Sequence, residues 1–446
     1  MSPDANFAED ILGRALKSGA DQAEVFYRSY KNIAVEIKDQ AVESLSSSFS
    51  SGYCVRVIRN NRLGFSFSTE ISESDQIIAR AMEACRFVDE DPFHGLPASS
   101  SSGTIDIFDN AIRDMKEDDA ISLAMQIERA AYETDNRIKR VRKPSTSFTV
   151  SETIIANSRG VKAQYRSTSC SAQVTAVAES GNESQTGWDY MGSRSLKDIS
   201  FQNVGRTAAT SALRLLGSQK MQGRKTTVIL DHAVASDFLG VFASSLSSDA
   251  VQKGKSVLAG RLNTLVISPK ISIMDSGLLP GRLGSKPLDD EGVATQSKAL
   301  IKDGILLSYL FNTYTASKGN TVSTGNAVRG GHASLPSVGI TNLYLEPASP
   351  ADCVQAQDLF KTINKGLYVV DAMGIHLVNP ISGDFSIGVT GLWIEQGEVA
   401  FPVKEALISG NLLNFFSKVS ALGDDMKFYG SLGSPSLIIP DVDVSA

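Results

Sequence analysis

Histidines are the first residues of this sequence that could take part in metal or acid–base chemistry. The chain has four, His94, His232, His332 and His376. No two of them lie four residues apart, so the HExxH spacing that puts two zinc ligands on one face of a helix is missing. His94 lies in a proline-rich loop, where we expect an exposed side chain. The histidine spacing therefore predicts no zinc helix.

His232 has the most suggestive position of the four. Residues 226–230 form a short apolar, β-branched run that predicts a strand, and residues 231–239 follow in a helical pattern. Catalytic helices often begin at such a junction. The alternative is structural, since Asp231 is a good cap for the positive end of a helix. A lone histidine is more often structural than catalytic, and the structural alternative is favoured.

The acidic tripeptide Asp289-Asp290-Glu291 before Gly292 is a second group that could do chemistry. Carboxylates bind hard cations such as Ca²⁺, but the tripeptide lacks the alternating ligand spacing of an EF-hand loop. A turn with charged residues is the favoured interpretation. The chain also has no GxSxG elbow, phosphate-binding P-loop or GxGxxG fingerprint. Spacing alone predicts a multidomain protein without a convincing active site.

Composition limits the classes of protein to consider. A chain of 446 residues is expected to form two or three domains, and 42% hydrophobic with 21% charged residues is typical of a soluble globular protein. The net charge of -6 argues against a nucleic-acid or anionic-membrane surface, because such surfaces concentrate Lys and Arg. The basic run at 137–143 is interpreted as a solvated strand edge. We expect no nucleic-acid partner and no membrane partner.

The cysteines and the N-terminal residues of the sequence indicate the cellular compartment. The four cysteines form no CxxC pair, which argues against a structural zinc site and a disulfide scaffold (Cys54, Cys85, Cys170 and Cys353). The start of the chain is polar and acidic, and no apolar run approaches the roughly 18 residues of a membrane span. We therefore expect a cytoplasmic protein.

Hydrophobic periodicity predicts an α+β fold with two N-terminal antiparallel sheet units, each with packed helices, and a C-terminal mostly β domain entered by a strand-to-helix segment. The predicted domains are residues 1–110, 111–222 and 223–446. The proline- and serine-rich stretch 91–103 is interpreted as a loop too polar to order itself. The two N-terminal units have the same order of elements, which suggests a duplicated topology. The predicted helices are 7–16, 72–85, 116–133 and 199–216, and the predicted strands are 22–27, 33–37, 50–58, 63–68, 147–155, 161–167, 169–178, 265–267, 271–274, 306–311, 367–370 and 391–395.

Several segments, in order, resemble the TldD/PmbA family over essentially the whole chain. Residues 288–296 resemble its DDEG segment, and residues 300–306 its LI-x-x-G-x-L strand pair. Residues 323–329 resemble its TGN-x-x-R segment. The other matching segments are 341–345, 366–369, 379–386 and 434–436.

The resemblance implies two branches, described as subunits of one heteromeric cytoplasmic protease. In the TldD branch a helix carries HExxxH, whose histidines bind zinc while the glutamate activates water. In this sequence Asp231 stands at the first histidine, His232 at the glutamate and Ser236 at the second histidine. A serine hydroxyl is a poor zinc ligand, and residues 379–385 look like the PmbA version of their segment, without the TldD cysteine. These three positions are therefore interpreted as a degenerate motif of the PmbA/TldE branch.

The leading hypothesis that the resemblance implies is a PmbA/TldE-like subunit that lacks its own metal site and pairs with a TldD-like subunit carrying zinc. The pair would act on unfolded or extended peptides, in peptide maturation or antitoxin degradation, and an exposed sheet edge could hold such a peptide by strand addition. One alternative is an independent metallopeptidase that uses His232 with residues 289–291 or Asp384. Another is a homodimeric binding or regulatory protein, to which the family label of gyrase modulator belongs.

Overall fold

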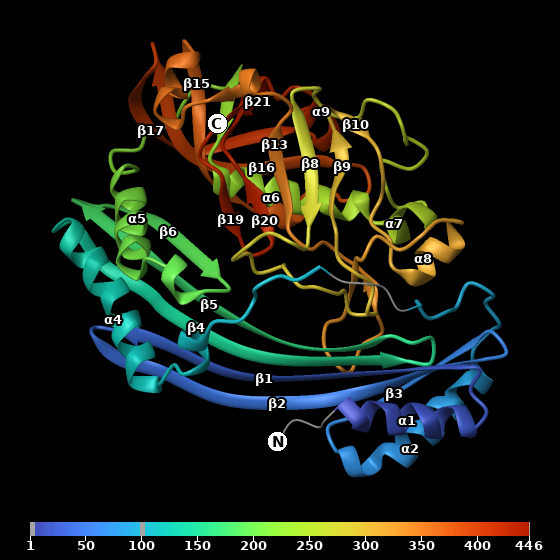
Figure 1. Cartoon of the computed structure of the whole chain (residues 1–446). Helices are drawn as coiled ribbons and strands as arrows, with labels where there is room; N and C mark the ends of the chain where they lie inside the picture. Colours follow the sequence, from blue (N-terminus) through green and yellow to red (C-terminus); the bar gives the residue numbers. More distant parts are fainter. Residues whose placement is uncertain (1–4, 99–102, 446) are drawn as a thin grey trace.

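The first half of the chain forms one long, curved antiparallel sheet. The computed structural model describes residues 5–98 and 103–445. In this part of the chain the sheet has the strand order β3-β2-β1-β4-β5-β6. Because β1 pairs with β4, one sheet spans both predicted N-terminal units (Figure 1). The strands are β1 (Gln22–Lys38), β2 (Ala41–Arg59), β3 (Arg62–Ser68), β4 (Ile138–Asn157), β5 (Lys162–Ser180) and β6 (Glu183–Ser193).

These strands are longer than sequence periodicity predicts. The predicted strands 22–27 and 33–37 are one strand, and so are 161–167 and 169–178. The polar centre of β1 breaks the apolar alternation, but its backbone pairs with β2 on one side and β4 on the other. Backbone pairing on both sides thus overrides a weak side-chain pattern. Asn60-Asn61, between the predicted strands 50–58 and 63–68, predicts a hairpin turn because asparagine tolerates positive φ; both residues have positive φ at the turn between β2 and β3, which confirms it.

Two pairs of helices cover one face of this sheet. Val25 and Tyr27 of β1 pack in the cluster with the first pair, and Ile33 and Val35 in the cluster with the second. Alternate residues of a strand face opposite sides, so all four odd-numbered residues point to the same face. Each half therefore repeats a helix, three strands and a helix, as the duplicated topology predicts. The helices are α1 (Ala5–Lys17), α2 (Ser74–Ala84), α4 (Glu117–Thr134) and α5 (Phe201–Leu213), with the short α3 (Asn110–Arg113) before α4.

The stretch 91–103 is a loop where it is described. Residues 91–98 contain no helix or strand, but Leu96 is buried and its N–H donates to the Gln22 side chain. The expectation that this stretch is too polar to order itself is therefore wrong for residues 91–98. The four serines, 99–102, lie outside the described residues.

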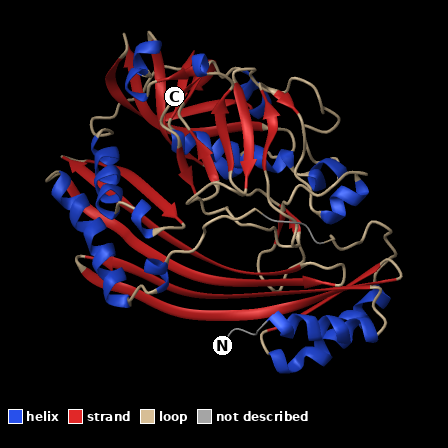
Figure 2. Ribbon diagram, viewed as in Figure 1, coloured by secondary structure: helices blue, strands red, loops and turns tan. Residues whose placement is uncertain are grey.

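The rest of the described chain forms two large sheets with a helix between them (Figure 2) and a small two-stranded sheet, β11-β12. One sheet has the order β10-β9-β8-β13-β20-β19, and the other β14-β18-β21-β17-β16-β15-β7. Helix α6 (His232–Ala243) follows β7 directly and buries Val234, Phe238 and Phe242 in the shared core. This arrangement confirms the α+β class and the mostly β C-terminal region with its strand-to-helix entry.

The remaining elements belong to this C-terminal region. The predicted strand 306–311 is wrong beyond Leu306, and 265–267 makes only an isolated bridge. No helix in the described ranges is long and apolar enough to cross a membrane. The strands are β7 (Arg224–Leu230), β8 (Ile271–Ser276), β9 (Ser297–Lys302), β10 (Ile305–Leu306), β11 (Ala327–Val328), β12 (Ser337–Val338), β13 (Leu343–Pro347), β14 (Cys353–Val354), β15 (Lys365–Met373), β16 (Asp384–Glu395), β17 (Glu398–Asn411), β18 (Ala421–Gly423), β19 (Lys427–Tyr429), β20 (Leu432–Ser434) and β21 (Leu437–Ser445); the short helices are α7 (Ser248–Gln252), α8 (Thr313–Lys318) and α9 (Leu412–Ser417).

Candidate functional site

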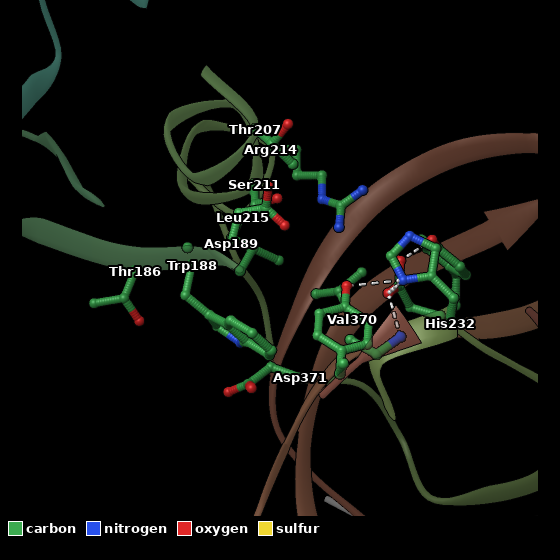
Figure 3. A pocket seen from close by; sticks show the side chains of 15 residues that line it. Thr186, Trp188, Asp189, Thr207, Ser211, Arg214, Leu215, His232, Val370 and Asp371 are labelled. Carbon is green, nitrogen blue, oxygen red and sulfur yellow. Dashed lines mark hydrogen bonds and ion pairs between the residues drawn. The ribbon is translucent and has the colours of Figure 1, made fainter. Parts of the chain in front are cut away.

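A cavity of about 220 Å³ lies where α6 begins, between the curved sheet and the C-terminal region. Strand β6 and helix α5 form one wall, and β15, β19 and the start of α6 form the other. Figure 3 shows Trp188 and Asp189 from the first wall and His232 and Asp371 from the second. The cavity therefore joins residues far apart in sequence around the predicted strand-to-helix junction.

Asp231 is the cap of α6. Its carboxylate accepts a hydrogen bond from the N–H of Ala233 at 3.0 Å, which satisfies one of the free donors at the helix start. The hydroxyl of Tyr368, on β15, donates to the other carboxylate oxygen. Burial and this carboxylate raise the pKa of Tyr368. Asp231 is thus held by protein donors, as the structural alternative predicts.

His232 lines the cavity beside this cap. Its Nδ1 lies 3.1 Å from the Asp231 carboxylate and 3.0 Å from the hydroxyl of Tyr429 on β19. Burial and the neighbouring carboxylate of Asp231 raise the pKa of Tyr429, which keeps its hydroxyl protonated. The ring is oriented by its neighbours, as a structural histidine would be.

Ser236, one turn further along α6, does not face the cavity. It is 1% exposed, and its hydroxyl donates to the carbonyl of His232 at 2.8 Å. A catalytic zinc takes three protein ligands, and the three motif positions offer one capped carboxylate, one oriented imidazole and a hydroxyl bound to the backbone. These positions do not fit a zinc ion. Within residues 5–98 and 103–445, no three His, Cys, Asp or Glu side chains gather as a metal-binding group.

The cavity wall is both aromatic and acidic. Trp188 and Tyr429 meet edge to face, with ring centroids 5.5 Å apart. Asp189 is buried, which raises its pKa, although it forms an ion pair with Lys427. Burial also raises the pKa of Asp371. An aromatic wall with hydrogen-bonding groups suits contact with a peptide, because rings contribute apolar area and carboxylates accept backbone N–H groups.

The other histidines lie elsewhere. His94 is half-buried against Tyr314, with ring centroids 5.1 Å apart, and burial lowers its pKa. The expectation that it is exposed is therefore wrong. His332 packs near Phe67, and His376 belongs to a short turn after β15. None of the three lines the cavity at α6.

The acidic tripeptide joins the two halves of the molecule. Asp290 bonds Lys286 at 2.9 Å and Arg28 of β1 at 3.0 Å, and Glu291 bonds Arg56 of β2 at 3.0 Å. Burial opposes ionisation of Asp290, but these cations outweigh it and lower its pKa. The third carboxylate, Asp289, accepts backbone N–H groups of 291, 293 and 327.

The buried tripeptide is thus an ionic contact between the curved sheet and the C-terminal region. Its carboxylates are 0–2% exposed and already have partners. Asp384 lies in a different place, where its carboxylate accepts from the Asn411 amide. The structure does not bring His232, the tripeptide and Asp384 together, which leaves the alternative of an independent metallopeptidase without a ligand set.

Fold and site together define a class of protein: a duplicated helix–sheet unit packed on a region of two large sheets, with a buried helix between those sheets whose start lines a cavity. Family models match three successive parts of the chain, which are described as PmbA/TldA metallopeptidase domain 1 (residues 23–85), central domain (110–216) and C-terminal domain (223–446). The chain belongs to the PmbA/TldD metallopeptidase family.

Individual relatives agree with this assignment. The chain is 30% identical over 393 residues to a metalloprotease PmbA homologue of Buchnera aphidicola (strain Bp), with 86% of this chain and 84% of that protein covered. It is 28% identical to metalloprotease PmbA of Escherichia coli O157:H7, with 98% and 96% covered. A crystal structure of a candidate modulator of a DNA gyrase from Thermotoga maritima has the same fold, with a TM-score of 0.92, 24% identity and 99% of each chain covered. The resemblance to the PmbA/TldE branch is confirmed.

Sequence reasoning placed Asp231 and His232 correctly at the start of a helix but missed their partners. Tyr368 lies 137 positions from Asp231, and Tyr429 lies 197 positions from His232. Neither tyrosine belongs to a motif that assigns it a chemical role. The nearest signal is the match of residues 366–369 to a family strand, which includes Tyr368. The structure was needed to show that these residues meet.

Proposed function

We propose that this chain is the PmbA/TldE-type subunit of a heteromeric cytoplasmic metalloprotease, and that its TldD-type partner carries the zinc. In this role the chain contributes a wall that receives unfolded or extended peptides, in peptide maturation or antitoxin degradation. The observation that carries the proposal is the set of hydrogen bonds at the start of α6. The Ser236 hydroxyl donates to the helix backbone, and Asp231 and His232 are held by two tyrosines.

The family membership supports the pairing with a protease, because the relatives include proteins named metalloprotease PmbA and one named metalloprotease TldD homologue. The cavity supports contact with a peptide. Its aromatic and acidic wall lies beside the start of α6. The family resemblance implies that the corresponding helix of the TldD branch carries the metal. We expect no metal in this chain and one zinc in its partner.

The test is a peptidase assay on an unfolded peptide with this chain alone, a TldD-type chain alone and their mixture, with bound zinc measured in each. We expect cleavage to need the mixture, with zinc only in the TldD-type chain. His232→Ala in this chain should leave the zinc content of the mixture unchanged, because His232 Nδ1 is occupied by protein neighbours.

A matched variant sharpens the assay. Trp188→Ala removes aromatic area from the cavity wall and should raise the KM of the mixture for the peptide while its zinc content stays constant. Stoichiometric zinc and cleavage from this chain alone, both lost in His232→Ala, would overturn the proposal. Full activity of the TldD-type chain alone would also overturn it.

A further inference from the structure

Two charged side chains that line the cavity at α6 have no ion-pair partner. Arg214 follows the last residue of α5, and Asp371 belongs to β15. In the described part of the chain neither forms an ion pair, whereas Asp189, which lines the same cavity, is paired with Lys427. A charge beside a cavity is costly to desolvate without a partner of opposite sign. Both positions are therefore suited to charges that a ligand brings.

The guanidinium of Arg214 is held in place but keeps an unused donor. Its Cζ lies over the ring of Tyr368, 5.7 Å from the ring centroid, which is the geometry of a cation–π contact. Its Nε is buried and has no hydrogen-bond partner among the described residues. A guanidinium presents its N–H donors in a planar fork that matches a carboxylate, and a buried donor without an acceptor is costly. The Arg214 end of the cavity is therefore suited to a carboxylate.

The carboxylate of Asp371 lies where negative charge is in excess. Burial raises the pKa of Asp371, and burial followed by the charge of Asp371 raises the pKa of Asp237, on α6, to about 6. Figure 3 shows Asp371 beside the indole of Trp188, a ring type whose face also attracts cations. The Asp371 end of the cavity is therefore suited to an ammonium group.

The two ends of the cavity are separated along β15. Tyr368, which carries the Arg214 guanidinium on its ring, and Asp371 are three positions apart, which is about 10 Å at roughly 3.3 Å per strand residue. A β-bulge between Val369 and Asp371 interrupts the alternation of side chains, so Tyr368 and Asp371 both line the cavity. Three residues of an extended peptide also span about 10 Å. The separation of the two charges therefore fits a peptide of this length.

We propose that the cavity binds a short peptide with two free ends, about three residues long, with its terminal carboxylate at Arg214 and its terminal ammonium group at Asp371. The rings of Trp188 and Tyr429, which also line the cavity, contact the middle of the ligand. Only a ligand with both charges compensates both side chains. An inorganic anion would suit Arg214 and leave Asp371 without a partner, and a cation would do the reverse.

The inference rests on the proposed function for the class of ligand, a peptide, and narrows that class to short peptides with free termini. Such peptides are supplied whole or are left when a longer peptide is hydrolysed, because each hydrolysis creates one carboxylate and one amino group. A longer peptide can place only one charged end in the cavity and should bind more weakly. Binding is measured on this chain alone, so it is tested separately from cleavage.

Titration calorimetry of the full chain tests the two charges of the ligand. The probes are trialanine with free termini, its C-terminal amide, its N-acetyl derivative and free alanine. We expect trialanine to bind saturably at millimolar concentrations or below. Amidation and acetylation should each raise the dissociation constant roughly tenfold or more, because each removes a charge-assisted hydrogen bond. Free alanine, whose two charges are too close to reach both ends, should also bind roughly tenfold or more weakly than trialanine.

Two variants assign each charge of the ligand to its end of the cavity. In Arg214→Gln, amidation of trialanine should no longer weaken binding while acetylation still does, and Asp371→Asn should show the reverse. A general loss of structure would not produce this pairing of one variant with one end of the ligand. Arg206→Gln is the matched control and should keep both effects, because Arg206 is exposed on α5 and donates to Gln202 and Asn203 of its own helix.

Several results would overturn the inference. The wild-type chain alone decides against it if trialanine does not bind saturably, or if amidation or acetylation leaves the dissociation constant unchanged. Inorganic phosphate that binds as tightly as trialanine would make this an anion site and also overturn it. Cleavage by the mixture with a TldD-type chain, without binding of trialanine to this chain, would overturn this inference and leave the proposed function standing. Binding with the expected end-group effects but no cleavage by the mixture would support the inference and count against the proposed function.

Discussion

The buried ionic contact between the two halves of the molecule leads to a quantitative prediction for Arg56. Its guanidinium donates to the Glu24 carboxylate at 3.1 and 2.7 Å and to Glu291 at 3.0 Å. All three side chains are at most 7% exposed. Arg56 lies on β2 and Glu291 in the C-terminal region, so one side chain links the two halves. The perturbation is Arg56→Met, which keeps much of the side-chain volume and removes the charge.

The expected cost follows from what remains after the substitution. Glu24 keeps its ion pair with Arg329. Glu291 keeps a neutral donor, the N–H of Thr313 at 2.9 Å, and loses its ion pair. Removing one member of a buried ion pair costs about 3–5 kcal/mol, because the other charge stays buried without compensation. We therefore expect Arg56→Met to lower the free energy of unfolding by about 3–5 kcal/mol, with most of the loss due to Glu291.

Urea unfolding at neutral pH, followed by fluorescence, measures this cost. The two tryptophans, Trp188 in the curved sheet and Trp393 in the C-terminal region, allow each half to be followed in a single-tryptophan variant. Arg62→Met is the matched control, because the pair of Arg62 with Glu90 is 38% and 60% exposed and should contribute less than about 1 kcal/mol.

The double variant Arg56→Met, Glu291→Gln separates the buried charge from the lost packing. It removes the uncompensated carboxylate and should recover much of the stability lost in Arg56→Met. The reasoning is refuted if Arg56→Met is as mild as Arg62→Met. It is also refuted if the double variant is no more stable than Arg56→Met alone.

Two further predictions concern glycines in helices and the turn that follows α5. A Cβ at Gly205 of α5 would lie 2.1 Å from the carbonyl oxygen of Ile127 in α4, so Gly205→Ala should destabilise the chain by about 1–3 kcal/mol. A Cβ at Gly13 of α1 would meet no atom within 4 Å, so Gly13→Ala should stabilise the chain by about 0.4–1 kcal/mol. Thermal unfolding of the two variants compares these effects. The Gln185 amide and nearby N–H donors lower the pKa of Glu183 to about 2. The stability that Glu183 contributes is present above about pH 4.5 and is lost as the pH falls toward about 2. The difference in melting temperature between the wild-type chain and Glu183→Gln should therefore shrink on acidification, and a constant difference would contradict the assignment.

Much of the architecture could be predicted because local patterns agree with it. Alternating apolar residues predicted strands, helical spacing predicted α1, α2, α4 and α5, and Asn60-Asn61 predicted the hairpin turn. Strand β6 was missed because its polar and glycine-containing sequence, residues 183–193, has little alternation. It is held by pairing with β5 along its whole length and by packing against α5. Such non-local pairing is not visible in a window of sequence.

For the candidate site, the sequence by itself determined which residues stand at the positions that the resemblance singles out: Asp231, His232 and Ser236, at a junction of strand and helix. It could not determine what these side chains do. Tyr368 and Tyr429 approach from distant strands, and the acidic tripeptide meets Arg28 and Arg56 only when the sheets pack together. Residue types are properties of the chain, whereas hydrogen bonds and ion pairs depend on distances of a few ångströms that tertiary packing sets. The tertiary structure therefore decided that the motif positions are held by protein neighbours and that the tripeptide joins the two halves of the molecule.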